Sequence, residues 1–328
     1  MSWVSRIRER LRQRQQEAEV VAALQRKQRL LSAHHFKVER SLIITGDPRG
    51  GTTWLMELLA RSPGLAINWE PLHHDRGVVP ASARWGRRPS IPEDDTDPAR
   101  VEAMREILTH ARSTPWTTRY LSEAQAASAQ RVLTKFVRAN LLLPWITARF
   151  ELAYRPILLL RHPVPTVLSQ MKAFPHDDHH AARWTAPDQL FNDAFKAEEG
   201  YLNTLPPGLV RHVGVWCIRN LCTLRHARHG KSWMVMHYEN LVMDPARHLQ
   251  QIAREWQLDE AAMMAGGLRQ RSTTDFGNDL RSDPAEQVGK WLRRMEPGTL
   301  ADVQAVLDHY GIGFYTANAA MPKNPPAL

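Results

Sequence analysis

The sequence predicts an α/β protein with a single doubly wound parallel sheet of about five strands flanked by helices. Short apolar segments alternate along the chain with segments of helical period, a pattern typical of strands and helices that alternate in a parallel sheet. The segment 156–161 is apolar up to its final arginine, as expected for a strand that helices cover on both faces. No internal repeat and no interdomain linker is visible, so we expect one α/β domain.

Each expected element follows from its local residue pattern. Almost no Gly or Pro interrupts 2–31, which predicts one long helix. Strands are expected at 41–46, from Leu65 to Trp69, at 131–137, at 156–161 and at 232–238. Helices are expected at 52–61, 99–112, around Pro144, and at 163–173, 209–229, 244–256 and 299–310. Residues 76–98 and 174–208 are rich in Pro and polar residues, and we expect irregular segments there.

Composition limits the class of protein. The chain has 328 residues, of which 43% are hydrophobic, and we place the α/β domain at 39–328 after a helical extension at 1–38. No apolar run has the length of a membrane span, and the N-terminus lacks the apolar segment of a signal peptide. The two cysteines, Cys217 and Cys222, form neither a disulfide framework nor a metal-ligand spacing. We therefore expect a cytoplasmic protein.

Much of the net charge of +9 is concentrated at the N-terminus. Residues 1–31 contain eight Lys and Arg and three Glu, a local charge of +5. Two interpretations stay open: the helix packs on the body with its arginines in solvent, or it contacts an anionic membrane surface or dimerises. The remainder of the chain is only mildly basic and does not spread basic and aromatic residues over a surface, so no nucleic-acid partner is expected.

The most informative segment is the turn between the first strand and the first helix. A strand, a glycine-rich turn and a helix N-terminus together bind phosphate, because unpaired backbone N–H groups point at the anion. The spacing Gly46-x4-Gly51 matches the first part of a Walker A loop, but Thr52 stands where that motif has its Lys. Arg49 supplies a cation two residues before Gly51 instead. The loop therefore fits a phosphate ester other than ATP.

Other residues of this turn and a second segment supply further candidate ligands. Gly50 and Gly51 let the backbone approach a ligand closely, and Thr52 and Thr53 offer hydroxyl and N–H donors. Trp54 either stacks on an adenine or belongs to the core. Further along, Arg161 ends a strand and Ser169 follows about two helical turns later on the same side. An arginine fork and a hydroxyl in this arrangement suit a second phosphate.

Three segments resemble, in the same order, motifs of the sulfotransferases that use PAPS (3′-phosphoadenosine 5′-phosphosulfate). The segment 47–55 resembles their 5′-phosphosulfate loop, 155–169 resembles their 3′-phosphate element, and 236–245 resembles their Tyr-Glu-Asp-Leu strand end, with Asn240 in place of Asp. The resemblance implies PAPS as donor without a metal, with Arg49 beside the leaving oxygen. It also implies that Arg161 and Ser169 bind the 3′-phosphate.

The candidate general base is Glu70. Many small-molecule sulfotransferases have a histidine after their third strand, but the segment here contains Lys135 and Arg138 and no histidine. This segment and Trp69-Glu70-Pro71-Leu72 resemble carbohydrate-type and bacterial members, some of which use a Glu as base. The resemblance implies a saccharide or glycolipid hydroxyl as acceptor, with 72–98 and 174–208 on the acceptor side. Alternatively, Glu70 forms a structural ion pair, and His73 and His74 are reserve candidates for the base.

Other clusters and functions are weighed against this hypothesis. The group His176-Asp-Asp-His179-His180 has the composition of a metal site, but we expect a solvated loop or an acceptor contact. Lys290, in a segment resembling the one that closes over the 3′-phosphate, and Arg269 and Arg271 are further candidates for that phosphate. The alternative functions are a degenerate P-loop kinase or NTPase, and a non-catalytic nucleotide-binding protein of the same fold.

Overall fold

The fold is described from a computed structural model, which covers residues 3–175, 177, 179–265, 273 and 283–323. Five parallel strands form one sheet in the order β2-β3-β1-β4-β5. The strands are β1 (Leu42–Gly46), β2 (Leu65–Trp69), β3 (Arg131–Lys135), β4 (Ile157–Leu160) and β5 (Met234–His237). The predicted fold class, a single doubly wound parallel sheet, is confirmed.

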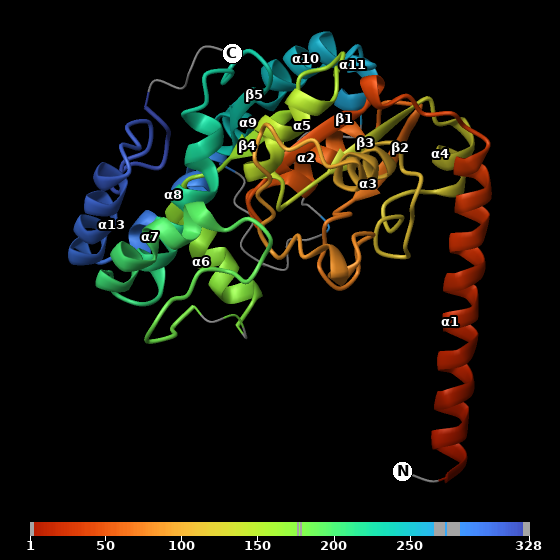
Figure 1. The fold of residues 1–328 in the computed structure, drawn as a ribbon, viewed down its shortest axis with the longest axis horizontal. Helices are drawn as coiled ribbons and strands as arrows, with labels where there is room; N and C mark the ends of the chain where they lie inside the picture. The colour runs from red at the N-terminus through yellow and green to blue at the C-terminus, as the bar shows by residue number, and fades with distance from the viewer. Residues whose placement is uncertain (1–2, 176, 178, 266–272, 274–282, 324–328) are drawn as a thin grey trace.

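Helices follow the strands and occupy both sides of the sheet (Figure 1). They are α1 (Trp3–Ser32), α2 (Thr52–Leu59), α3 (Pro98–Leu108), α4 (Glu123–Ser128), α5 (Leu143–Arg149), α6 (Pro163–Ala173), α7 (Asp193–Thr204), α8 (Leu209–Leu224), α9 (Tyr238–Met243), α10 (Pro245–Trp256), α11 (Glu260–Met264), α12 (Pro284–Gly289) and α13 (Pro297–His309).

Alternate residues of each strand enter different parts of the core. Ile44 and Leu159 share one apolar cluster with side chains of α2 and α10. Leu158 and Leu160 point the other way, into a cluster that contains side chains of α6, α8 and α13. All five strands are buried along their full length, because helices cover both faces.

The strand order places a reversal of chain direction at the central strand. β1 lies between β3 and β4, so the chain leaves the sheet in opposite directions on the two sides of β1. In open α/β sheets of this kind, ligands bind at such a reversal point. The loop after β1, the end of β3 and the end of β4 therefore meet at one edge, where the candidate residues were expected.

Two parts of the sequence-based element assignment were wrong. The segment 174–208, expected to be irregular, contains α7, which buries Phe195 and Leu202 in the cluster that includes α8. The apolar periodicity of this helix is weak in the sequence, because only these two of its side chains are fully buried. The helix expected at 209–229 ends at Leu224, and a turn follows in which Gly230 has a positive φ of 74°.

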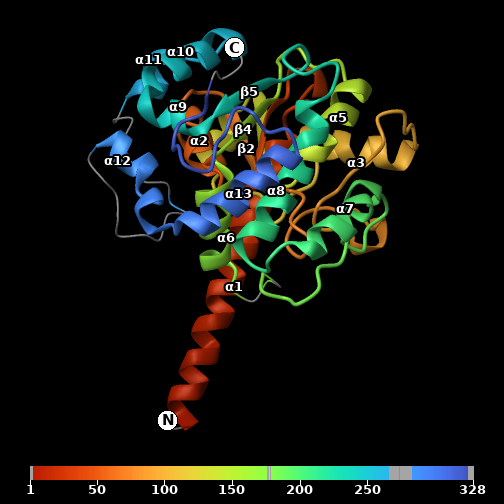
Figure 2. The same ribbon diagram turned by 90° about the vertical axis from the view of Figure 1, so that its left-hand side faces the viewer.

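Helix α1 projects from the body and contacts it through its C-terminal end (Figures 1 and 2). Leu31 is buried, Arg26 pairs with Glu123 of α4 at 2.8 Å, and the Lys27 ammonium donates to the Thr118 carbonyl. The described side chains between 9 and 21 are all exposed. Among the described residues, α1 thus packs on the body only near its C-terminal end, and the exposed part before it is not explained by packing. Within the described residues, no helix is both long and apolar enough to cross a membrane.

Candidate active site

The loop after β1 is shaped by two residues with left-handed backbone conformations. Arg49 has a φ of 66° and Gly51 a φ of 92°, and the Gly50 N–H donates to the Asp47 carbonyl at 2.9 Å. Helix α2 begins at Thr52 directly after this turn. The unpaired N–H groups of the first helical turn are therefore presented at the end of the loop, the arrangement that binds a phosphate or sulfate group.

A buried polar network holds the base of the loop. Asp47 is 4% exposed, pairs with Arg219 of α8 at 3.1 Å and accepts from the Asn220 amide at 2.8 Å. Asn220 in turn accepts from the Asn140 amide at 2.8 Å, and Asn140 accepts from the Thr45 hydroxyl at 2.8 Å. Sequence reasoning missed this network. An Arg-Asn pair inside the apolar helix 209–224 was the available signal, because charged residues are rarely buried without a partner.

Arg49, Arg161 and Ser169 come together beside the loop. The Arg49 Nε donates to the Ser169 hydroxyl at 3.0 Å, and Arg161 Nη1 donates to the Arg49 carbonyl at 2.9 Å. The neighbouring Gln170 amide donates to the Pro48 carbonyl at 2.7 Å, which fixes α6 against the loop. Two segments more than a hundred residues apart thus form one cluster of donors. The roles of its members as nucleotide ligands remain predictions.

Tyr238 forms a wall of this cluster. The Arg161 guanidinium lies over its ring at 4.6 Å, and the Trp54 ring meets it edge-on at 6.0 Å. A Cβ at Gly51 would approach the Tyr238 ring to 2.3 Å, so glycine is required there both by its φ and by this close contact. Glycine, hydroxyl and guanidinium donors around a helix N-terminus match the chemistry of a phosphosulfate ligand.

Glu239, in the third motif, has a structural position. It is 1% exposed and accepts from the His162 N–H at 2.7 Å and from the Tyr315 hydroxyl at 2.8 Å. Burial raises the pKa of this carboxyl, and the two hydrogen bonds oppose that change. Glu239 therefore ties the ends of β4 and β5 to the C-terminal segment around Tyr315.

Glu70 lies on the other side of the loop, at the end of β2. Its carboxylate pairs with the Lys135 ammonium at 2.5 Å, and Lys135 is 1% exposed at the end of β3. Burial lowers the pKa of Lys135, and the nearby Glu70 carboxylate opposes that change. The ion pair anticipated as an alternative is thus present, and the role of Glu70 as base remains a prediction. Glu70 itself has a left-handed φ of 46°.

His73 and His74, the reserve bases, follow Glu70 closely. Their rings stack at 4.9 Å, and His74 Nε2 lies 2.8 Å from Asp75 Oδ2. Burial, and then the charge of Arg138, lower the pKa of His73 to about 4, so its imidazole is neutral at pH 7. His73, His74 and Asp75 place one potential ligand atom each within 4.8 Å of one another. Because the arginine charge also acts on His74, this corner disfavours a further cation.

Only parts of the remaining candidates are described. His179 is buried against the His212 ring at 4.6 Å, so the expectation of a solvated loop is wrong for this member. Asp177 pairs with Arg87 at 3.2 Å, whereas His176 and Asp178 lie outside the described residues. Lys290 follows α12, which packs against α9 and so lies near Tyr238. The candidates Arg269 and Arg271 also fall outside the described residues.

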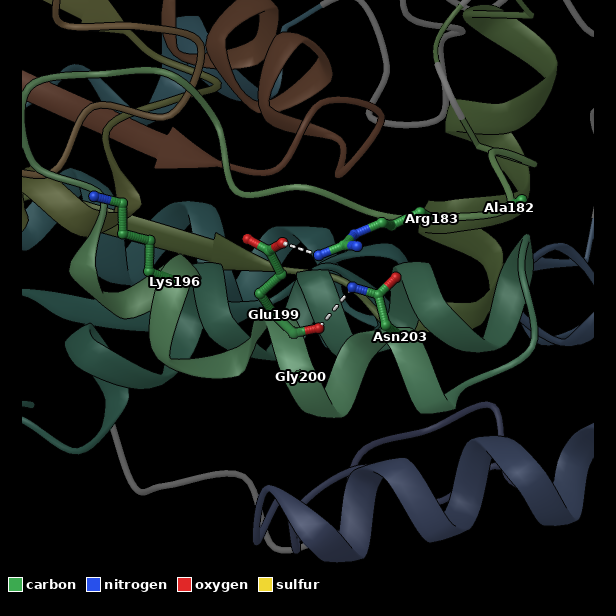
Figure 3. A pocket seen from close by; sticks show the side chains of 6 residues that line it. All are labelled: Ala182, Arg183, Lys196, Glu199, Gly200 and Asn203. Atoms are coloured by element: carbon green, nitrogen blue, oxygen red, sulfur yellow. Dashed lines mark hydrogen bonds and ion pairs between the residues drawn. The ribbon is translucent and has the colours of Figure 1, made fainter.

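Two open depressions on the described surface lie away from this cluster. One, of about 500 Å³, is lined by Ala182, Arg183, Lys196, Glu199, Gly200 and Asn203. In it the Glu199 carboxylate pairs with Arg183 and the Glu199 carbonyl accepts from Asn203 (Figure 3). The other, of about 720 Å³, lies between the end of α1 and residues 109–113. The candidate site is therefore identified by the hydrogen-bond donors that meet around Arg49 and Arg161, and not by either depression.

The comparisons with known proteins agree with the motifs. Residues 41–261, more than half of the chain, match the profile of the Sulfotransferase family. No curated protein sequence matches the chain significantly.

Among solved structures, mouse sulfotransferase SULT7A1 complexed with PAP is 14% identical, with 88% of this chain and 89% of that chain covered and a TM-score of 0.42. The sulfotransferase domain of the Synechococcus PCC 7002 olefin synthase is 18% identical, with 83% and 94% covered and a TM-score of 0.44. The sulfotransferase domain of the curacin biosynthetic pathway is 16% identical, with 83% and 97% covered and a TM-score of 0.43. On the strength of the family profile, the chain belongs to the sulfotransferase family, and it is an enzyme that uses PAPS as sulfuryl donor.

Proposed function

We propose that this sulfotransferase transfers the sulfuryl group of PAPS to a hydroxyl of a carbohydrate or glycoconjugate, leaving PAP and a sulfate ester. The observation that carries the proposal is the convergence of Arg49, Arg161 and Ser169 on the N-terminus of α2. Cationic and hydroxyl donors beside a helix N-terminus can hold a nucleotide with two separate phosphate groups.

Arg49 is the catalytic cation in this proposal. As the acceptor oxygen bonds to sulfur, the bond from sulfur to the bridging oxygen breaks, and that oxygen takes the electron pair. A guanidinium and the N–H groups of Thr52 and Thr53 beside it stabilise the new charge without reorganising solvent. The network below Asp47 supports this role, because it fixes the loop on α8 before any ligand arrives.

Glu70 is the general base that receives the proton of the acceptor hydroxyl. The Lys135 ammonium at 2.5 Å keeps the carboxylate in one orientation. After transfer, the proton resides on the Glu70 carboxyl and is released to solvent with the product. His73 is a weaker candidate, because its half-buried ring stands among arginine side chains.

The acceptor class rests on the residues around Glu70. The segments Trp69-Glu70-Pro71-Leu72 and Lys135–Arg138 resemble carbohydrate-type members of the family. Trp69 is buried at the end of β2 and packs against Trp116 at 4.4 Å and against Tyr120 at 4.9 Å, and these two outer rings are only half-buried. Rings of this kind offer an apolar face to the C–H groups of a sugar while the carboxylate meets its hydroxyl.

The test is transfer of label from 35S-labelled PAPS to a whole extract of the source cell, followed by identification of the labelled product. We expect a labelled acceptor with the wild type, and none with Arg49→Ala. Glu70→Gln should bind PAP normally and lose turnover. Labelling of protein or of a non-glycosidic metabolite alone would refute the carbohydrate assignment. Turnover of ATP with magnesium, without PAPS turnover, would instead support the kinase alternative.

We also propose that α1 contacts an anionic membrane surface from the cytoplasmic side. Two free cysteines agree with a reducing compartment, and α1 carries a net charge of +5. The protein should sediment with vesicles that contain phosphatidylglycerol and remain in solution with pure phosphatidylcholine. A chain truncated before Val20 should lose sedimentation. Equal sedimentation of both chains, or of neither, would contradict the proposal.

A further inference from the structure

Arg138 stands at the acceptor side of the site, three residues after β3. The charged groups that act on it include Glu70, Arg87, Asp177 and Asp75. They come from the loop after β2 and from the two irregular segments 76–98 and 174–192, which lie on the acceptor side of Glu70. Arg138 therefore belongs to the surroundings of the hydroxyl that is to be modified.

The carboxylates around Arg138 already have other partners. Glu70 pairs with Lys135 at 2.5 Å, and Asp177 pairs with Arg87 at 3.2 Å. Asp75 lies 2.8 Å from the imidazole of His74.

Among the described residues, no hydrogen bond or ion pair connects Arg138 to a carboxylate, and its Nε is buried without a hydrogen-bond partner. A second arginine, Arg88, interacts electrostatically with Arg138 from the segment 76–98. Its guanidinium donates to the Arg87 carbonyl at 3.1 Å and likewise meets no carboxylate among the described residues.

The proximity of Arg138 and Arg88 is unfavourable as long as no anion binds them. A guanidinium keeps its charge in proteins, and Arg138 is half-buried with its Nε shielded from solvent and without a hydrogen-bond acceptor. Burial and the neighbouring Arg87 lower the pKa of Arg138, and burial together with Arg219 and Arg138 lowers that of Arg88. An oxyanion bound to Arg138 would reduce the repulsion between these arginines and supply the acceptor that the Arg138 Nε lacks.

We infer that Arg138, assisted by Arg88, forms a subsite for an oxyanion of the acceptor, so that the acceptor carries a carboxylate or phosphate close to the sulfated hydroxyl. The inference rests on the proposed function, because it assigns this side of the site to the acceptor. The donor is an unsuitable occupant, since its two phosphate groups have their own donors around Arg49 and Arg161. A planar arginine fork binds carboxylate and phosphate through two parallel hydrogen bonds.

The experiment compares three sugars that differ in charge, on protein saturated with PAP so that the donor phosphate sites are filled. Methyl β-D-glucuronide, glucose 6-phosphate and methyl β-D-glucoside are titrated and followed by saturation-transfer NMR. We expect at least one of the two anionic sugars to bind about tenfold or more tightly than the neutral glucoside. The preferred anion distinguishes a carboxylate-bearing from a phosphate-bearing acceptor. Equal binding of all three sugars, or no binding of either anion, would overturn the inference.

Variants assign the effect to Arg138. Arg138→Gln should reduce the preference for the anionic sugar to near unity, and Arg138→Lys should keep part of it. Arg84→Gln is the matched control, because Arg84 lies in the same segment as Arg88 but is exposed and paired with Asp188. An unchanged preference in Arg138→Gln would overturn the inference.

PAP affinity, measured in parallel, separates the two proposals. Wild-type protein that fails to bind PAP would contradict the donor assignment. PAP binding without anion preference would contradict the subsite alone.

Discussion

Gly51→Ala is expected to damage the nucleotide site through a local clash. The added Cβ would lie 2.3 Å from Tyr238 Cδ2 and 2.6 Å from Cε2, so the ring would have to move by roughly 1 Å to reach normal contact. The left-handed φ of 92° adds about 1–2 kcal/mol of strain for an alanine, and overpacking adds about 1–3 kcal/mol. The free energy of unfolding should therefore fall by about 2–5 kcal/mol.

The displaced ring also supports Arg161, whose guanidinium lies 4.6 Å above it. Calorimetric titration should therefore show weaker PAP binding in Gly51→Ala, by about tenfold. Gly230→Ala is the matched control, because Gly230 has a φ of 74° but no atom within 4 Å of an added Cβ. It should lose about 1–2 kcal/mol of stability and bind PAP normally. Equal stability losses and normal PAP binding in both variants would refute the reasoning about Tyr238.

Three further predictions follow from named contacts. Glu70→Gln should lower kcat by about 10²–10⁴ and leave the PAP dissociation constant unchanged; retained kcat would exclude Glu70 as the base. Arg219→Met should lower the free energy of unfolding, measured in urea, by about 3–5 kcal/mol, because Asp47 stays buried without its cation. Arg155→Met is the control: it removes the partly exposed pair with Glu255 and should cost about 1 kcal/mol or less. Burial lowers the pKa of His110 from 6.5 to about 4. Between pH 6.5 and pH 4 the unfolded chain therefore binds a proton at His110 that the folded chain does not bind. The free energy of unfolding should fall by about 3 kcal/mol as the pH drops from 6.5 to 4. His110→Asn, which tolerates the φ of 54°, should remove that part of the slope, and an unchanged slope would show that His110 is not its source.

The sequence was sufficient for the sheet and for the loop. The fully apolar strand β4 and the helix after Arg161 follow local patterns, and α6 spans the predicted residues 163–173. The turn between β1 and α2 could be predicted because its conformation depends on glycine, which the sequence shows directly at Gly50 and Gly51. Ser169 could be placed near Arg161 because helical spacing fixes their shared side.

Long-range polar partners could not be predicted in the same way. Asp47 and Arg219 are 172 residues apart by number, and only the packing of α8 under the loop brings them to 3.1 Å. The pairing of Glu239 with Tyr315 likewise depends on how the C-terminal segment returns to β5. Glu70 shows the intermediate case: an ion pair was anticipated, but its partner Lys135 became certain only through the register of β2 against β3.

The central claim is that Arg49, Arg161 and Ser169 hold a nucleotide with a 3′-phosphate. The most direct measurement is calorimetric binding of PAP and of AMP, which lacks that phosphate, to the wild type and to Arg161→Ala. We predict that the wild type binds PAP about tenfold or more tightly than AMP, because charged hydrogen bonds to the 3′-phosphate contribute about 1.5–3 kcal/mol. In Arg161→Ala the two affinities should become nearly equal. A wild type that does not distinguish PAP from AMP, or a variant that keeps the full preference, would contradict the account.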